Sequence, residues 1–134
     1  MWPSASPPPA APALTLNLHD IAELPAVRAQ LRRHTVADAS DADLLDQLVL
    51  ALDEMASNAL RHGGGEVRAT VRRTDDAYLI EVSDQAAAAP PTPAVDRDPS
   101  EGGLGLYLIA EMATEHGWYV EEGHKFVWAL LPRA

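Results

Sequence analysis

The chain has 134 residues, 47% of them hydrophobic and 22% charged, which suits one globular domain with a buried core. Cysteine is absent, so disulfides and thiolate zinc sites are excluded, and a reducing cytoplasm is the expected location. The net charge of -10 disfavours direct binding to nucleic acid or to an anionic membrane, because both need a basic surface.

The chain opens with a segment rich in proline and alanine. We expect residues 1–12 to be a disordered tail, followed by a single domain at 13–134. Residues 14–18 alternate apolar and polar side chains, as a half-buried strand does. No apolar run reaches the roughly 18–20 residues that cross a bilayer, so we expect no membrane segment.

Two helices should follow this strand. Asp20 is a suitable N-cap for a helix over about 21–34. Ser40 is a suitable N-cap for a second helix, which the glycines at 63–65 should end. The second helix carries an apolar stripe at helical spacing, which predicts its core face: Leu44, Leu48, Leu52, Met55 and Ala59.

The second half of the chain predicts two hairpins separated by a loop and a helix. Residues 67–72 and 78–82 alternate in polarity, as antiparallel strands with one wet face do. Residues 85–101 are irregular and rich in alanine and proline, which indicates a long functional or disordered loop. A helix should begin after Gly105 and stop at Gly117, and the last hairpin should turn at 122–124.

This order of elements predicts an α+β fold. We expect a two-layer sandwich, with a mixed, largely antiparallel sheet of about five strands and about three helices on one face. The long loop and the helix layer should enclose the functional site.

The second helix carries the most informative polar pair. Glu54 and Asn58 form an E-x-x-x-N motif and project from one face of the helix, together with Arg61. An amide oxygen can ligate a metal ion, and a carboxylate one turn away can act as a base. Polar pairs at this spacing also decorate ordinary surface helices, so the motif alone leaves that interpretation open.

Two further patterns fit a nucleotide site. Asp84 follows an apolar strand, where a carboxylate can accept a hydrogen bond from an exocyclic amine or simply start a turn. Residues 102–105, Gly-Gly-Leu-Gly, lead into a helix whose free N–H groups can approach a phosphate. A junction without a ligand explains the glycines equally well.

Taken together and in this order, the motifs resemble the Bergerat ATP-binding domain of histidine kinases, gyrase and the MutL mismatch-repair proteins. Residues 52–62 resemble the N box of that family, residues 82–84 the start of its G1 box, and residues 103–106 its G2 box. The chain looks most like the stand-alone bacterial versions, the anti-sigma-factor serine/threonine kinases.

The resemblance implies a role for each matching residue. Asn58 would ligate a Mg²⁺ ion that bridges the ATP phosphates, Glu54 would be the general base, and Asp84 would bind the adenine amine. Residues 85–101 would form a lid, from which Arg97 would reach a phosphate. The remaining ATP contacts would come from Arg61, Ala86, Gly102, Gly103, Leu104, Gly105 and Leu106. Ala86 departs from the family, which usually has glycine there, and this puts adenine affinity in doubt.

The resemblance also implies an activity and partners. The chain would transfer the γ-phosphate of ATP to a STAS-domain anti-anti-sigma protein, would sequester a sigma factor, or both, and would form a homodimer. Ala86 keeps open a non-catalytic binding module that works with or without nucleotide. A weak ATPase is a third reading. A histidine kinase is less favoured, because no phosphoacceptor helical domain precedes residue 12.

Overall fold

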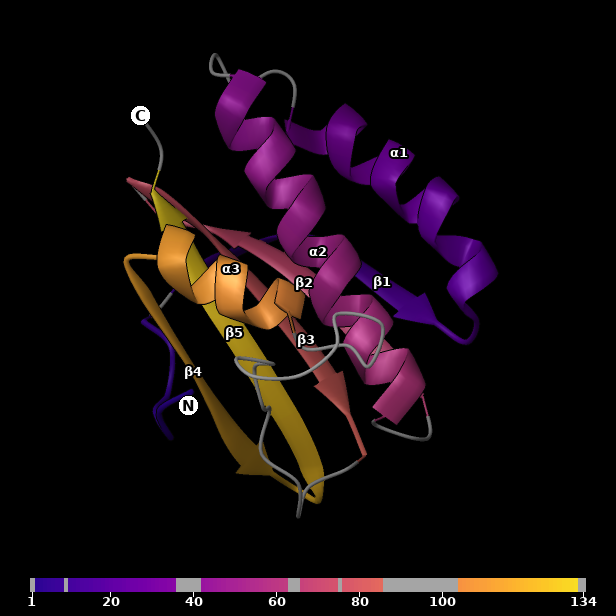
Figure 1. The fold of residues 1–134 in the computed structure, drawn as a ribbon, viewed down its shortest axis with the longest axis vertical. Coiled ribbons are helices and arrows are strands. Elements are labelled where there is room, and N and C mark those ends of the chain that lie inside the picture. The colour runs from indigo at the N-terminus through magenta and orange to yellow at the C-terminus, as the bar shows by residue number, and fades with distance from the viewer. Residues whose placement is uncertain are drawn as a thin grey trace.

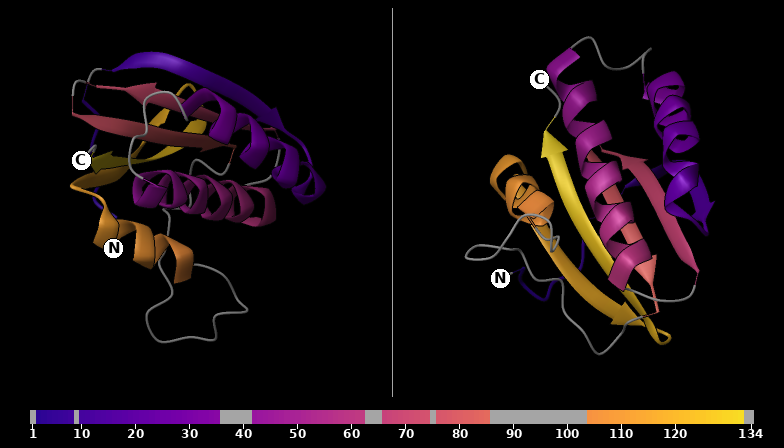
Figure 2. Two further views of the ribbon diagram at one scale, coloured as in Figure 1. Left: turned by 90° about the horizontal axis from the view of Figure 1, so that it is seen from above. Right: turned by 45° about the vertical axis from the view of Figure 1, so that its right-hand side comes forward.

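The structure, a computed structural model, describes residues 2–8, 10–35, 42–62, 66–74, 76–85 and 104–132. Five strands form one sheet in the order β1-β2-β3-β5-β4, and neighbouring strands are antiparallel throughout. Three helices lie on one face of this sheet, which makes the α+β sandwich predicted from the sequence (Figures 1 and 2). The strands are β1 (Ala11–Leu18), β2 (Val67–Arg73), β3 (Ala77–Asp84), β4 (Glu115–Glu121) and β5 (His124–Pro132).

The helices begin and end for local reasons. Asp20 caps a short 3-10 turn, η1 (Ile21–Glu23), by accepting a 2.9 Å hydrogen bond from the N–H of Ala22, and the Glu23 carboxylate completes the capping box. This confirms the predicted cap, although the α-helical geometry begins only at Leu24. The helices are α1 (Leu24–Thr35), α2 (Ala42–His62) and α3 (Leu104–Met112).

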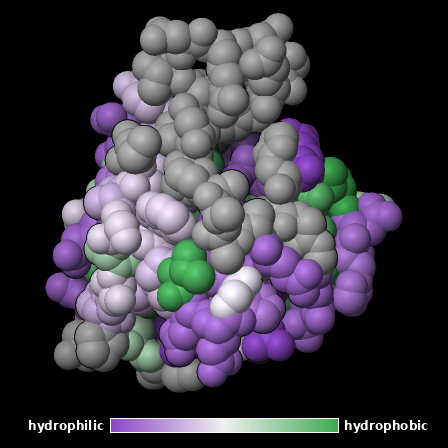
Figure 3. Space-filling view, turned by 90° about the horizontal axis from the view of Figure 1, so that it is seen from below, coloured by the Kyte–Doolittle hydropathy of each residue, from purple (hydrophilic) through white to green (hydrophobic). Residues whose placement is uncertain are grey.

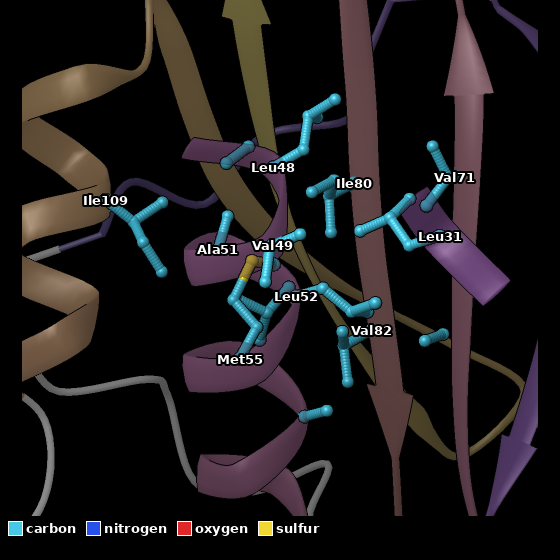
Figure 4. Close-up of a cluster of buried hydrophobic side chains, with 14 of the residues drawn as sticks. Leu31, Leu48, Val49, Ala51, Leu52, Met55, Val71, Ile80, Val82 and Ile109 are labelled. Carbon is cyan, nitrogen blue, oxygen red and sulfur yellow. The ribbon is translucent and has the colours of Figure 1, made fainter. Parts of the chain in front are cut away.

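The predicted apolar stripe of α2 packs against the centre of the sheet. Leu48 and Leu52 are fully buried, and Met55 is 2% exposed. Figure 4 shows these side chains facing Ile80 and Val82 of β3, and it shows Ile109 approaching from α3. Burial of such side chains is the main favourable term in folding. The orientation of α2 about its own axis is therefore set by its apolar side chains.

The N-terminal segment differs from the expected disordered tail. Trp2 is 1% exposed and packs edge-on against His116, with 4.8 Å between ring centroids. The N–H of Trp118 donates to the Pro3 carbonyl, and the N–H of Ala5 donates to the Trp118 carbonyl, each at 3.0 Å. Proline lacks an N–H group but keeps its carbonyl, so a proline-rich segment can still pair with a sheet edge.

The central strand β3 is buried along its whole length, where we expected one wet face. Its helix-facing side chains enter the main core. On the opposite face, Leu79 packs with Trp128 and Leu130 in a second apolar cluster, to which Ala10 adds. The Trp128 indole N–H donates a 2.8 Å hydrogen bond to the Ala5 carbonyl. Because the N-terminal segment lies over this face, the predicted polar side of the sheet is partly covered.

Two glycines have roles that the sequence indicated only in part. The predicted helix ends at Met112, and Gly117 lies within β4, so Gly117 does not stop a helix. A Cβ atom at Gly117 would meet the Pro3 carbonyl oxygen at 2.9 Å and the Trp128 ring at 3.0 Å, which explains the glycine. The β4–β5 hairpin turns as predicted at Glu122 and Gly123, whose φ angles are 53° and 79°.

The described part of the surface exposes few large hydrophobic side chains. Among the described residues, no helix is both long and apolar enough to cross a bilayer. Seen from below, hydrophobic side chains are separated by wide hydrophilic areas (Figure 3). The large hydrophobic residues that are exposed in the described part of the chain are Ile21, Tyr107, Leu108 and Val120.

Replacing Trp2 tests whether the N-terminal segment is part of the fold. Trp2→Ala should lower the free energy of unfolding by about 3 kcal/mol, because it removes a large buried side chain. Urea denaturation measures the change, and Ser4→Ala, at an exposed neighbouring position, serves as the control. A Trp2→Ala midpoint equal to that of the wild type would show that the segment does not pack in solution.

Candidate nucleotide site

The Glu54/Asn58 pair lies beside the core on α2. Both side chains are half-buried, whereas Ala51 and Met55 are buried. Residues three or four apart share a helix face, so the pair lies on the same side of α2 as Ala51. That side faces α3, from which Ile109 approaches (Figure 4). The pair therefore lines the junction between α2 and α3, as a cleft wall would.

The Glu54 carboxyl has a raised pKa. Burial is the largest cause, the negative charge of neighbouring Asp53 adds to it, and the Arg61 guanidinium opposes it. Asp53 itself pairs with Arg28 of α1 at 2.7 Å. A carboxylate with a raised pKa accepts a proton more readily, which suits a general base. Arg61 is exposed, and its positive charge lowers the pKa of Glu54, so it lies within electrostatic range of the Glu54 carboxyl.

Asp84 occupies the last position of β3 on the side that faces the helices. It is 2% exposed and lies opposite Lys125 of β5 in the strand register. The Lys125 Nζ atom is 3.7 Å from the Asp84 Oδ2 atom, and Lys125 is 5% exposed. The predicted purine-binding carboxylate is thus buried and faces an ammonium group.

Sequence reasoning missed Lys125, although a signal was present. Alternate residues of a strand share a face, so Lys125 belongs to the same face as Val127, Ala129 and Leu131, which are all buried in the main core. A lysine in line with three core residues is unusual and indicates a buried partner. The partner became evident only from the pairing register of β3 and β5.

The glycine motif opens α3, as predicted. Leu104, Gly105 and Leu106 are its first three residues, and the Leu106 side chain is 1% exposed in the core. Leu106 therefore anchors the start of the helix, and only its backbone is suited to face a ligand. Ala86, Gly102, Gly103 and the lid, apart from exposed Gln85, lie outside the described residues.

The site elements converge at one end of the sandwich. Helix α2 and strand β3 run in the same direction (Figure 1), so Asp84, the last residue of β3, lies at the same end of the sandwich as the C-terminal part of α2, which holds Asn58. The end of α3 remote from β4 lies next to α2 (Figure 1). A helix N-terminus, an amide, a half-buried carboxylate and a buried carboxylate are thus contributed by three elements, of which α2 packs against both β3 and α3.

The residues present suit a magnesium nucleotide better than a bare metal ion. In the described part of the chain, no group of three or more His, Cys, Asp or Glu side chains is placed to hold a metal. Magnesium commonly binds through one or two protein oxygens together with substrate phosphates and water. Asn58 would supply such an oxygen, and the N-terminus of α3 would face the phosphates.

Comparison with known proteins establishes the family. A family model described as the histidine kinase-like ATPase domain matches residues 19–129. The chain belongs to this family. Its fold is accordingly of the Bergerat type, and membership implies ATP binding. A search of curated proteins found no match.

Among the solved structures that match, two illustrate the shared fold. One is the SiaB–SiaC complex from Pseudomonas aeruginosa, where a chain matches with a TM-score of 0.67 at 15% identity over 91% of this chain and 90% of that chain. The other is the structure of the RsbU and RsbW domains of Rv1364c from Mycobacterium tuberculosis, with a TM-score of 0.58 at 20% identity. That match covers 88% of this chain and 32% of the longer protein.

A separate polar cluster lies on the helix-free face of the sheet. The Tyr119 hydroxyl donates a 2.9 Å hydrogen bond to the Glu81 carboxylate, and the Tyr119 ring stacks on Phe126. Burial raises the pKa of Glu81, and burial together with this hydrogen bond raises the pKa of Tyr119. A cavity of about 360 Å³ adjoins the cluster. It is on the opposite face from Glu54 and does not belong to the candidate site.

The raised pKa of Glu54 predicts a pH-dependent effect of its removal. At pH 7, well above the usual pKa of 4.5, the folded chain holds an ionised carboxylate in a partly buried place, which costs free energy. Glu54→Gln removes this charge and should therefore raise the free energy of unfolding at pH 7. The gain should shrink as the pH falls towards 4.5 and be lost below it, because the folded carboxyl, whose pKa is raised, takes up its proton above the usual value. Urea denaturation at several pH values measures this, with exposed Glu111→Gln as the control. A gain that is constant with pH would contradict the assignment.

Proposed function

We propose that the chain is an ATP-dependent serine/threonine protein kinase of the anti-sigma-factor type. The observation that carries the proposal is the Glu54 carboxyl, which is half-buried, has a raised pKa and lies one helical turn from Asn58. Family membership supplies the nucleotide, since the family is one of ATPase domains. The acceptor hydroxyl belongs to a protein partner.

Each residue has a defined task in this proposal. Asp84 accepts a hydrogen bond from the purine, Asn58 offers its amide oxygen to Mg²⁺, and backbone N–H groups at Gly103 and Gly105 face the phosphates. Magnesium bound there neutralises phosphate charge. Glu54 accepts the proton of the attacking hydroxyl. Phosphoryl transfer depends mainly on positioning and charge stabilisation, so these few groups are sufficient.

The proposed partners are a STAS-domain anti-anti-sigma protein, a sigma factor, or both. One structural match is a SiaB–SiaC complex and the other contains an RsbW domain, so the fold occurs in chains that assemble with other proteins or domains. The net charge of -10 suits a partner with basic patches. We further propose that the chain works in the cytoplasm as a homodimer, which sedimentation at micromolar concentration would test.

Phosphate transfer tests the kinase assignment. With γ-labelled ATP and a panel of purified STAS-domain proteins, the wild type should label a serine or threonine of one of them. Glu54→Gln should reduce the rate by about 10²–10⁴-fold, because it removes the base but keeps the shape of the side chain. Binding of ATP should change little.

The matched control is Glu111→Gln, which removes an exposed carboxylate from α3 and should leave transfer unchanged. Transfer that survives in Glu54→Gln at the wild-type rate would contradict the general-base role. Phosphate release without any labelled acceptor would instead identify a weak ATPase.

A non-catalytic binding module is the second candidate, and one contact favours it. Lys125 already neutralises the Asp84 carboxylate at 3.7 Å, so this charge is balanced without a nucleotide. The presence of Ala86 in place of the usual glycine also favours this candidate. In its nucleotide-free form this candidate predicts no ATP binding at millimolar concentration, and in either form it predicts tight binding to a protein partner without phosphate transfer.

A further inference from the structure

Two adjoining cavities on the helix-free face of the sheet form a polar recess. The smaller has a volume of about 150 Å³ and the larger about 360 Å³. Alternate residues of β2 enter the main core, so Arg68 and Arg72 belong to the opposite face, where both cavities lie. We call the two cavities together the sheet recess, and five residues line both of them: Arg68, Arg72, Glu81, Ser83 and Phe126.

The smaller cavity is chemically suited to an anion. Besides the two arginines, it is lined by Thr15, Thr70 and Ser83, whose hydroxyl groups can donate hydrogen bonds. The Nε atom of Arg72 is buried and has no hydrogen-bond partner among the described residues. A buried donor of a charged group is costly when it is left unpaired. We therefore expect a ligand to supply an acceptor to Arg72.

Glu81 favours a particular kind of anionic ligand. Its carboxyl is 7% exposed and accepts a hydrogen bond from the Tyr119 hydroxyl. Burial raises the pKa of Glu81, although the Tyr119 hydrogen bond and the charge of Arg72 lower it. A phosphate dianion next to this carboxyl would be repelled. A group that carries a carboxylate and an ammonium side by side suits both Arg72 and Glu81, because the guanidinium only donates hydrogen bonds and the ionised carboxylate only accepts them.

The larger cavity has an acidic rim and an aromatic wall. Glu66, Glu121 and Glu122 line it and are exposed, so they lie near its mouth. The Tyr119 ring stacks on the Phe126 ring, with 4.8 Å between their centroids. Carboxylates and aromatic rings both attract ammonium and guanidinium groups. The rim is therefore suited to a second cation.

The arginines and the hairpin glutamates are separated across the sheet. Arg68 and Arg72 are on β2 and Glu121 is on β4, with β3 and β5 between these strands. Three strand spacings amount to about 14 Å between the backbones. Arginine and glutamate have long side chains that narrow this gap from both sides. A ligand about two strand spacings long, roughly 10 Å, would span the remainder.

We propose that the sheet recess binds a basic α-amino acid, such as free arginine or lysine. The carboxylate of the ligand accepts hydrogen bonds from Arg72, and its α-ammonium faces Glu81. The ligand side chain extends past Phe126 and places its cation between Glu121 and Glu122. The proposal is independent of the proposed function, because the recess lies on the face of the sheet opposite Glu54.

Calorimetric titration of the full chain with arginine, agmatine and citrulline tests the proposal. Agmatine lacks the carboxylate, and citrulline keeps the amino-acid head but has a neutral side chain. Arginine should bind in the millimolar range or more tightly, with lysine within about tenfold of it. Agmatine and citrulline should each bind at least about tenfold more weakly than arginine, because each loses one charged contact.

Variants at the two ends of the recess locate the ligand. Arg72→Gln should weaken arginine at least about tenfold without weakening agmatine, which has no carboxylate to lose. Replacing both Glu121 and Glu122 by glutamine should weaken arginine by a similar factor and leave citrulline unchanged. The matched control is Arg33→Gln, which removes an exposed arginine from α1 and should change nothing.

Three outcomes would overturn the proposal. One is no detectable arginine binding at about 10 mM. Another is equal binding of arginine, agmatine and citrulline by the wild type. The third is unchanged arginine binding in a folded Arg72→Gln, with folding checked by thermal denaturation. If Arg72→Gln does not fold, the comparison of the three ligands on the wild type decides.

Discussion

The packing of α2 on the sheet is the constraint on which the candidate site depends. Leu48, Leu52 and Met55 have one well-buried arrangement against Ile80 and Val82, and this fixes the rotation of the helix. Once that rotation is set, the polar residues on the flank facing α3 have no freedom to point elsewhere. Apolar contacts therefore position the polar side chains of the candidate site, and these polar groups need supply little of the folding energy.

The same packing explains why the site carboxylates differ in character. Glu54 lies at the margin of the core, where partial burial raises its pKa and leaves it accessible to a proton donor. Asp84 lies deeper and is balanced by Lys125. In the proposed function, these different surroundings suit Glu54 to proton transfer and Asp84 to recognition.

The sequence predicted much of the fold and of the candidate site, and the features that it missed have physical reasons. Helical spacing located the core face of α2, and Asp20 located the start of the first helix, because both signals are local. The burial of Trp2, the place of Gly117 in β4 and the pairing of Lys125 with Asp84 all depend on contacts between distant segments. Periodicity carries no information on strand order or register, so these contacts could not be derived. Family motifs indicated the site residues, but Ala86 and the lid lie outside the described residues.

Binding of a magnesium nucleotide at α2 is the central proposal for this chain, and calorimetric titration with ATP tests it most directly. The wild type should bind ATP at micromolar concentration in the presence of Mg²⁺. Affinity should fall at least about tenfold without Mg²⁺ or in Asn58→Ala, because one change removes the ion and the other removes the side chain that would hold it. An ATP affinity that is the same with and without Mg²⁺, and unchanged in Asn58→Ala, would contradict the site. So would a folded wild type that binds no ATP at millimolar concentration.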